Sequence, residues 1–221
     1  MPASQKTKKK IAISKEDVVE WYMNDVLDGK GPMNVHLFAK NHGITEDEFY
    51  QLFGSLVAIE NHFFELIFDK TKETIQRSKP YQDYSAREKL LGFYFTFFGN
   101  LTSNRSFVLH LLKPYRLENL RKLKGLHKKF TAYVNELDFE KVDLKYHKLN
   151  KAKDMAINEA AWLQLLSVMR FWYKDESPGF EKTDIFIEKL LTASFDLMNT
   201  RPMKSVTDLG KFIFKEMNPV S

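Results

Sequence analysis

The chain has 221 residues, of which 43% are hydrophobic and 29% charged, and its formal net charge is +5. This composition is typical of a globular protein with a substantial core, and a charge this small permits a nucleic-acid partner without requiring one. The absence of cysteine excludes disulfide bonds and thiolate metal sites.

The first part of the chain predicts a basic tail followed by four helices. Residues 1–13, which carry Lys6, Lys8, Lys9 and Lys10, are typical of a flexible tail. The helices are expected from Ser14 to about Gly29, and over 35–42, 46–53 and 56–78. Their start signals are capping residues: Ser14 with Asp17, Asn34, Thr45 with Glu48, and Ser55.

The second part of the chain also predicts helices alone. Ser85 and Glu88 form a capping box for a helix over 86–101, which is rich in aromatic residues. Further helices are expected over 105–112, 115–137, 151–174, 182–199 and 204–217. Residues 113–153 carry twelve Lys or Arg against five acids, a pattern typical of a solvated face or of contact with DNA, an acidic partner or a membrane surface.

Residues 38–53 have the spacing of a helix-turn-helix. Ala39 is small enough to let a second helix approach, and Gly43 suits a tight turn that needs a positive φ. Ile44 follows as the apolar plug of the interface. The inner faces are supplied by Phe38 on the first helix and by Phe49, Leu52 and Phe53 on the second.

The sequence LFAKNHGITEDEFYQLFGS resembles the DNA-binding domain of TetR-family transcriptional regulators. The most specific part is the ending from Phe49 to Ser55, and the resemblance to this domain covers about residues 14–70. Near the other end, EKTDIFIEKLLTASFDLM and SVTDLGKFIFKE are similar to a C-terminal subtype of the family. The resemblance implies a bacterial-type, one-component regulator that binds double-stranded DNA as a homodimer and responds to a small apolar ligand.

The resemblance also implies where DNA would be contacted. The helix over 46–53 would enter the major groove, with Thr45 matching a hydroxyl residue that meets phosphate and Tyr50 a tyrosine that touches the backbone. The candidate DNA-binding residues are Asn34, Lys40, Thr45, Glu46, Tyr50 and Gln51.

The charge of this helix departs from the family pattern. Glu46, Asp47 and Glu48 stand where the family usually has small or basic residues, and Leu56 stands where it usually has a lysine that contacts phosphate. Carboxylates oppose phosphate binding, although they also stabilise a helix start and can accept from cytosine N4. Three hypotheses remain open. The chain reads DNA, with its basic tail offsetting the acids from the minor groove. It is a TetR-fold protein that binds a lipid or hydrophobe and has lost DNA binding, or it is a pure protein-interaction module.

The aromatic helix over 86–101 predicts a large buried cluster in the C-terminal part. A packed core is one explanation. The resemblance implies another, a pocket for an apolar ligand, with candidate residues Phe93, Phe97, Phe107, Leu111 and Trp162.

The last two strong helices predict a homodimer. Residues 157–173 and 185–198 are apolar over more than one stripe, whereas a surface helix of a monomer needs only one. A twofold copy that completes a four-helix interface would cover the second face. The candidate interface residues are Trp162, Leu166, Met169, Phe186, Leu190 and Phe195.

No catalytic pattern is present in the sequence. The six histidines form no HxxxH or HExxH, and neither a phosphate-binding glycine loop nor GxSxG occurs. We therefore expect no enzyme activity, no cofactor and no metal. With no signal-peptide core and no apolar run of the roughly 20 residues that span a membrane, we expect a cytoplasmic protein without stable membrane insertion.

Taken together, these patterns predict an all-α, TetR-like fold of about nine or ten helices, with a three-helix helix-turn-helix domain and a larger helical bundle. The expected boundaries are a tail at 1–13, the helix-turn-helix domain at 14–55, a connector helix at 56–80 and a ligand-binding and dimerisation domain at 81–221.

Overall fold

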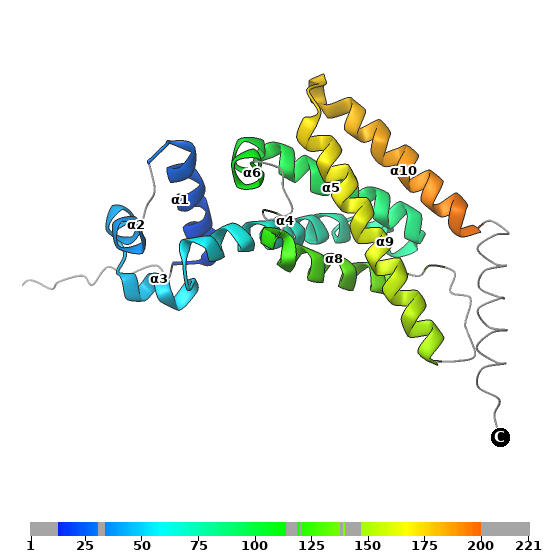
Figure 1. Ribbon diagram of the computed structural model, residues 1–221, viewed down its shortest axis with the longest axis horizontal. Helices are drawn as coiled ribbons and strands as arrows, with labels where there is room; N and C mark the ends of the chain where they lie inside the picture. The colour runs from blue at the N-terminus through cyan, green and yellow to red at the C-terminus, as the bar shows by residue number, and fades with distance from the viewer. Residues whose placement is uncertain are drawn as a thin grey trace, which may run out of the picture. The chain divides into compact units, whose positions relative to one another are not determined.

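The computed structural model describes residues 13–30, 34–113, 119, 121–137, 139 and 147–199, with the side chains of 147–153 and 199 excepted. Every regular element in these ranges is a helix, so the predicted all-α class is confirmed (Figure 1). The chain divides into two compact units, Met1–Leu66 and Ile67–Ser221. The division lies inside the helix that the sequence predicted as a connector.

The N-terminal unit contains α1 (Lys15–Leu27), α2 (Val35–Asn41), α3 (Glu46–Leu52) and the start of α4 (Leu56–Gln76). The predicted capping residues do start these helices: Ser14 with Asp17 and Thr45 with Glu48 form capping boxes, and the Asn34 side chain accepts from the backbone N–H of Leu37 at 2.8 Å. The core between the helices is apolar and largely aromatic, formed by Val18, Val19, Tyr22, Phe38, Ala39, Phe49, Phe53, Ile59, Phe63 and Phe64.

The C-terminal unit continues with the rest of α4. Its further elements are η1 (Lys79–Asp83), α5 (Ala86–Ser103), α6 (Arg105–Leu112), η2 (Arg121–Leu123), α8 (Lys124–Glu136), α9 (His147–Lys174), η3 (Pro178–Phe180) and α10 (Glu181–Asn199). The long helix α9 packs against α8 and α10, and α10 also packs against α5 (Figure 1). Helices α9 and α10 are joined by a short turn and form a hairpin along the bundle.

Two predicted helix boundaries were wrong. Of the basic helix expected over 115–137, residues 121–123 form a 3₁₀ turn and α8 begins at Lys124. No side chain caps the start of α8, and Gly125 in its first turn is a poor helix former, so this end is poorly specified by sequence. Helix α9 begins at His147, earlier than the expected residue 151.

Other expectations fall outside the described residues. These are the basic tail up to residue 12 and the helix over 204–217. Within the part of the chain that is described, no helix combines the length and the apolar character needed to cross a membrane.

Candidate functional site

The turn between α2 and α3 has the geometry of a helix-turn-helix. Gly43 adopts φ +67°, in the left-handed region that favours glycine, and the space around it is open. The backbone N–H of Ile44 donates to the carbonyl of Ala39 at 3.0 Å, closing the turn. Behind it, the rings of Phe38 and Phe49 meet edge to face at 5.7 Å. These contacts hold α3 against α2 through the residues that the spacing predicted.

His42 ties this turn to α1, which the sequence did not indicate. Its ring stacks on Trp21 at 5.0 Å, and its Nε2 lies 2.7 Å from a carboxylate oxygen of Asp25. Asp25 is buried and also accepts from Lys30 Nζ at 2.8 Å. Burial alone would raise the pKa of Asp25, but the hydrogen bonds from Lys30 and His42 outweigh it and lower the pKa. A charged Asp25 therefore joins three segments of the N-terminal unit.

Each acid at the start of α3 has a polar partner nearby. Glu48 accepts from the backbone N–H of Thr45 at 2.8 Å and completes the capping box. Asp47 accepts from Gln51 Nε2 at 3.0 Å, one turn further along the helix. Glu46 Oε1 lies 2.8 Å from His36 Nδ1 on α2. Hydrogen bonds within the unit thus occupy part of the accepting capacity of all three carboxylates.

A groove of about 420 Å³ opens where the starts of α2, α3 and α4 meet. It brings together three of the predicted DNA-binding residues, Asn34, Glu46 and Tyr50, whereas Lys40, Thr45 and Gln51 do not line it. Tyr50 is 52% exposed and Val57 is 58% exposed. The lining residues are Asn34, Val35, His36, Glu46, Tyr50, Ser55, Leu56 and Val57, and none of these is Lys or Arg. The groove therefore combines an apolar wall with a single carboxylate.

In the C-terminal unit, three of the five predicted pocket residues, Phe93, Phe97 and Trp162, lie in a packed aromatic cluster. The Phe93 ring lies 5.4 Å from Phe97, 5.3 Å from Phe130 and 5.1 Å from Tyr133. Trp162 joins the cluster through Phe130, at 6.5 Å. Phe107 and Leu111, the other two candidates, are buried on α6.

The turn between α9 and α10 is held by a polar network. Arg105, the first residue of α6, donates to the carbonyls of Trp172 at 2.9 Å and Asp175 at 3.0 Å, and its guanidinium lies 4.5 Å from the ring centroid of Trp172. Asp175 accepts from the backbone and side chain of both Ser177 and Thr183. Burial alone would raise the pKa of Asp175, but these hydrogen bonds bring it down to about 2. The turn therefore fixes α10 against α9 and α6.

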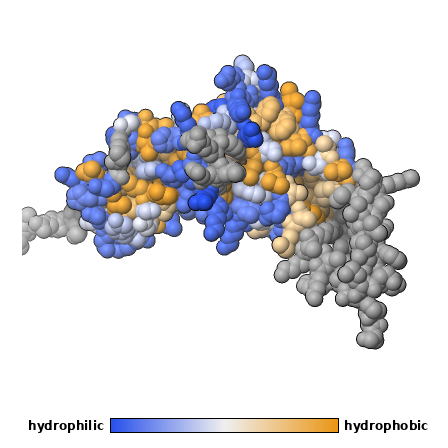
Figure 2. Space-filling view, in the orientation of Figure 1, coloured by the Kyte–Doolittle hydropathy of each residue, from blue (hydrophilic) through white to orange (hydrophobic). Residues whose placement is uncertain are grey.

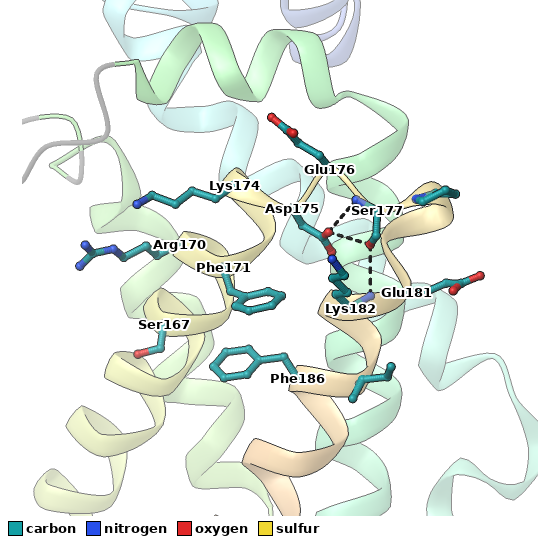
Figure 3. Close-up of a pocket in the computed structure, with 12 residues that line it drawn as sticks. Ser167, Arg170, Phe171, Lys174, Asp175, Glu176, Ser177, Glu181, Lys182 and Phe186 are labelled. Carbon is teal, nitrogen blue, oxygen red and sulfur yellow. Dashed lines mark hydrogen bonds between the residues drawn. The ribbon is translucent and has the colours of Figure 1, made fainter.

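A groove of about 980 Å³ lies between α9 and α10 beside this turn (Figure 3). Phe171 from α9 and Phe186 from α10 both line it, with their rings stacked on each other at 4.6 Å. Arg170, Lys174 and Lys182 line it together with Glu176 and Glu181. Hydrophobic side chains are also exposed over the α9–α10 hairpin on the face shown in Figure 2. Over both helices as a whole, the exposed large hydrophobic residues include Met155, Leu163, Phe171, Ile185 and Leu197.

The sequence model of the tetracycline repressor-like C-terminal domain matches residues 89–213, which is more than half of the chain. The chain belongs to the TetR family. No curated protein matches it.

The exposed face of α9 differs from the predicted dimer interface of this TetR-family chain. Met169 is fully buried in the protomer, so its assignment to the interface was wrong. Trp162 turns inward, where its ring lies 4.7 Å from His127 of α8, and Phe195 stacks on Phe139 at 5.9 Å. Leu166, Phe186 and Leu190 are half-buried.

The residues that α9 does turn outward were not among the predicted ones. Ala156, Ala160, Leu163 and Ser167 are exposed, and Leu163 is 60% exposed. Their spacing of four, three and four residues is that of a helix–helix seam. This spacing was available in the sequence, but the larger apolar residues beside it gave the stronger pattern.

Some lysines of the basic segment over 113–153 already have partners within this TetR-family chain. Lys129 on α8 lies 2.7 Å from both carboxylate oxygens of Asp69 on α4, and Lys122 donates to the carbonyl of Leu111 at 3.1 Å. These lysines contribute to the structure of the C-terminal unit. They are therefore poorer candidates for an external acidic partner than the net charge of the segment suggested.

Proposed function

We propose that the chain is a one-component transcriptional regulator that binds double-stranded DNA through α3 as a homodimer and responds to a small hydrophobic ligand. The observation that carries the proposal is the α2–α3 turn. Gly43 supplies the positive φ, Phe38 and Phe49 lock the two helices, and the start of α3 stays open to solvent. That is the arrangement in which the second helix of a helix-turn-helix enters the major groove.

The acidic start of α3 is compatible with DNA binding because its carboxylates have local donors. Thr45, Gln51 and His36 each hydrogen-bond one of the three acids. These contacts satisfy part of the accepting capacity of the carboxylates within the protein, although each carboxylate keeps its charge. They do not supply cations, so we expect weak nonspecific affinity and a shallow dependence of binding on salt.

The homodimer is supported by the outer face of the α9–α10 hairpin. Leu163 is surrounded along α9 by Ala156, Ala160 and Ser167, and these small exposed residues permit the close approach of another helix. The stacked pair of Phe171 and Phe186 extends the apolar surface onto α10. A twofold copy of the hairpin covers both helices and gives the dimer two α3 helices, one for each half of a palindromic duplex.

The ligand site is proposed at the aromatic cluster of α5 and α8. Three rings lie within about 5.5 Å of the Phe93 ring, so a ligand that enters must separate the helices that carry them. Such a movement gives the bound and free states different structures. A ligand that binds one state more tightly then shifts the DNA-binding equilibrium.

Selection of genomic fragments by the purified protein tests the DNA-binding part. At moderate salt the protein is expected to enrich a palindromic site and to lose affinity for it as salt rises. Gly43→Pro, which removes the φ that the turn requires, is the matched control and should enrich nothing. Failure of the wild-type protein to enrich any site would refute the regulator function.

One observation favours a second function. The groove at the starts of α2, α3 and α4 contains no Lys or Arg among its lining residues, as expected of a TetR-fold protein that binds a lipid or other hydrophobe and has lost DNA binding. Native mass spectrometry of protein purified from cells distinguishes the two. A stoichiometric apolar ligand together with no enriched DNA site would support this second function.

A further inference from the structure

The three acids at the start of α3 are not equivalent. Glu48 is used by the capping box, and Asp47 is bonded to Gln51 of the same helix. Glu46 is instead held by a residue of a different helix, His36 of α2, and it is the only one of the three that lines the groove at the starts of α2, α3 and α4. Its carboxylate is thus the one placed where a ligand of this groove would meet it.

The contact with His36 leaves half of this carboxylate available. A carboxylate carries no proton, so the His36 Nδ1 must be the donor and Glu46 Oε1 the acceptor. The bond restricts the rotamers of an otherwise flexible side chain. The second oxygen, Oε2, can then accept from a group in the groove.

Glu46 also lies at the position from which a helix-turn-helix contacts the bases of DNA. It is the first residue of α3, and the N-terminal residues of the second helix of a helix-turn-helix contact base edges in the major groove. The donors on offer there are the amino groups of cytosine N4 and adenine N6. Adenine presents the acceptor N7 beside its amino group, and this lone pair repels a carboxylate. Cytosine is therefore the better partner.

We propose that Glu46 determines specificity by accepting a hydrogen bond from N4 of one cytosine in each half-site, with His36 as its positioning residue. The inference rests on the proposed function, because it requires the duplex to bind at α3. In this proposal, the Glu46 carboxylate increases the specificity for one DNA sequence and lowers the affinity for phosphate.

Selection from randomised duplexes with the wild-type protein and Glu46→Gln tests the proposal. The wild type is expected to prefer cytosine at one position of each half-site by about tenfold, which is near the low end of the range for a bidentate contact because a single oxygen is used here. Glutamine pairs with adenine N6 and N7, so the variant should change the preference at that position from cytosine to adenine. Glu46→Ala should lose the cytosine preference without gaining another.

Two further variants separate base reading from charge and from folding. Asp47→Asn removes the same charge from the neighbouring residue and should leave every base preference unchanged. His36→Ala frees the Glu46 side chain, and it should weaken the cytosine preference severalfold at the same position while the melting temperature stays within a few degrees of wild type.

The possible outcomes distinguish the two proposals. If the wild type enriches no site, the proposed function fails and this inference fails with it. If the wild type enriches a site and both Glu46 variants enrich the same site with the same preferences, the regulator stands and the role of Glu46 is refuted. A changed preference with Asp47→Asn equal to that of Glu46→Gln would also refute it, because charge alone would then explain the effect.

Discussion

The outward surfaces of α2–α3 and of α9–α10 differ in chemistry: the first has polar side chains that are hydrogen-bonded to one another, and the second has apolar side chains that are exposed to water. On α2–α3 the polar groups are paired with one another, as Glu46 is with His36 and Asp47 with Gln51. On α9–α10 large apolar groups are exposed to water, including Leu163 and the Phe171–Phe186 pair. Both surfaces belong to helix pairs that are joined by a tight turn, although α9 and α10 are much longer than α2 and α3.

The difference indicates which kind of partner each surface suits. A surface of hydrogen-bonded polar groups costs little free energy to expose to water. It can also exchange some of its hydrogen bonds for those of a polar partner such as DNA. An apolar surface is costly to expose and gains from being covered by protein. The comparison therefore supports the proposal that the first surface binds DNA and the second binds another copy of the chain.

The largest effect is expected from removing the inner support of the α9–α10 hairpin. Trp172 is fully buried, donates to Thr102 at 3.0 Å and stacks under Arg105. Trp172→Ala should lower the free energy of unfolding by about 3–5 kcal/mol. Urea denaturation measures it. A loss below about 1 kcal/mol would show that the hairpin does not depend on this contact.

A charge on the outer face of the hairpin should dissociate the dimer without unfolding the protomer. Leu163→Glu places a carboxylate in the proposed seam, and we expect the dimer dissociation constant to rise at least about a hundredfold, because an unpaired charge is costly to bury. Analytical ultracentrifugation measures it. Leu27→Glu, at an exposed leucine of α1, is the control and should leave the dimer intact. A dimer that survives Leu163→Glu unchanged would place the interface elsewhere.

The polar network at the α9–α10 turn should make stability depend on pH. Asp175→Asn puts an amide NH₂ where a carboxylate oxygen accepts from Thr183, and it should cost about 2 kcal/mol at pH 7. The pKa of Asp175 is lowered to about 2, below its ordinary value of 3.8, so its contribution is complete above about pH 5 and is lost as pH falls toward 2. Thermal melts across this range should show the difference between wild type and variant shrinking. A difference that stays constant down to pH 2 would contradict the role of the charge.

The turn of the N-terminal unit should show a smaller effect. Gly43→Ala strains a residue at φ +67° but meets no neighbouring atom, so the cost should be only about 1–2 kcal/mol. Gly54→Ala lies in equally open space, without a left-handed backbone, and serves as the control. Equal melting temperatures for the two variants would mean that the turn does not require its glycine.

The smallest effect concerns the charge of α3. Asp47→Asn removes one carboxylate from α3, the helix proposed to bind DNA, and should raise affinity for DNA about twofold to fivefold, less at high salt because phosphate repulsion is screened. Fluorescence anisotropy with a duplex of any sequence measures it. Reduced affinity would indicate that Asp47 makes a favourable contact.

The sequence predicted those features that depend on neighbouring residues in the chain. Four residues cap helices through residues three positions further along the chain: Ser14, Asn34, Thr45 and Ser85. Such capping signals can be recognised in the sequence without knowledge of the fold. The role of Gly43 in the turn was predictable for the same reason, because a tight turn is a local structure.

Features that depend on the packing of separate helices were not predictable. Met169 and Leu163 are both apolar residues of α9, and only the position of α8 and α10 decides which one is buried. The contacts of His36 with Glu46 and of His42 with Asp25 join residues 10 and 17 positions apart in the chain. No periodic pattern indicates such pairs.

Native mass spectrometry of the protein mixed with the duplex that it enriches tests the assignment of both surfaces at once. The account predicts one complex that contains two chains and one duplex, and its loss when Leu163→Glu replaces the wild type. A complex of one chain with one duplex, or two chains that bind no duplex, would contradict it.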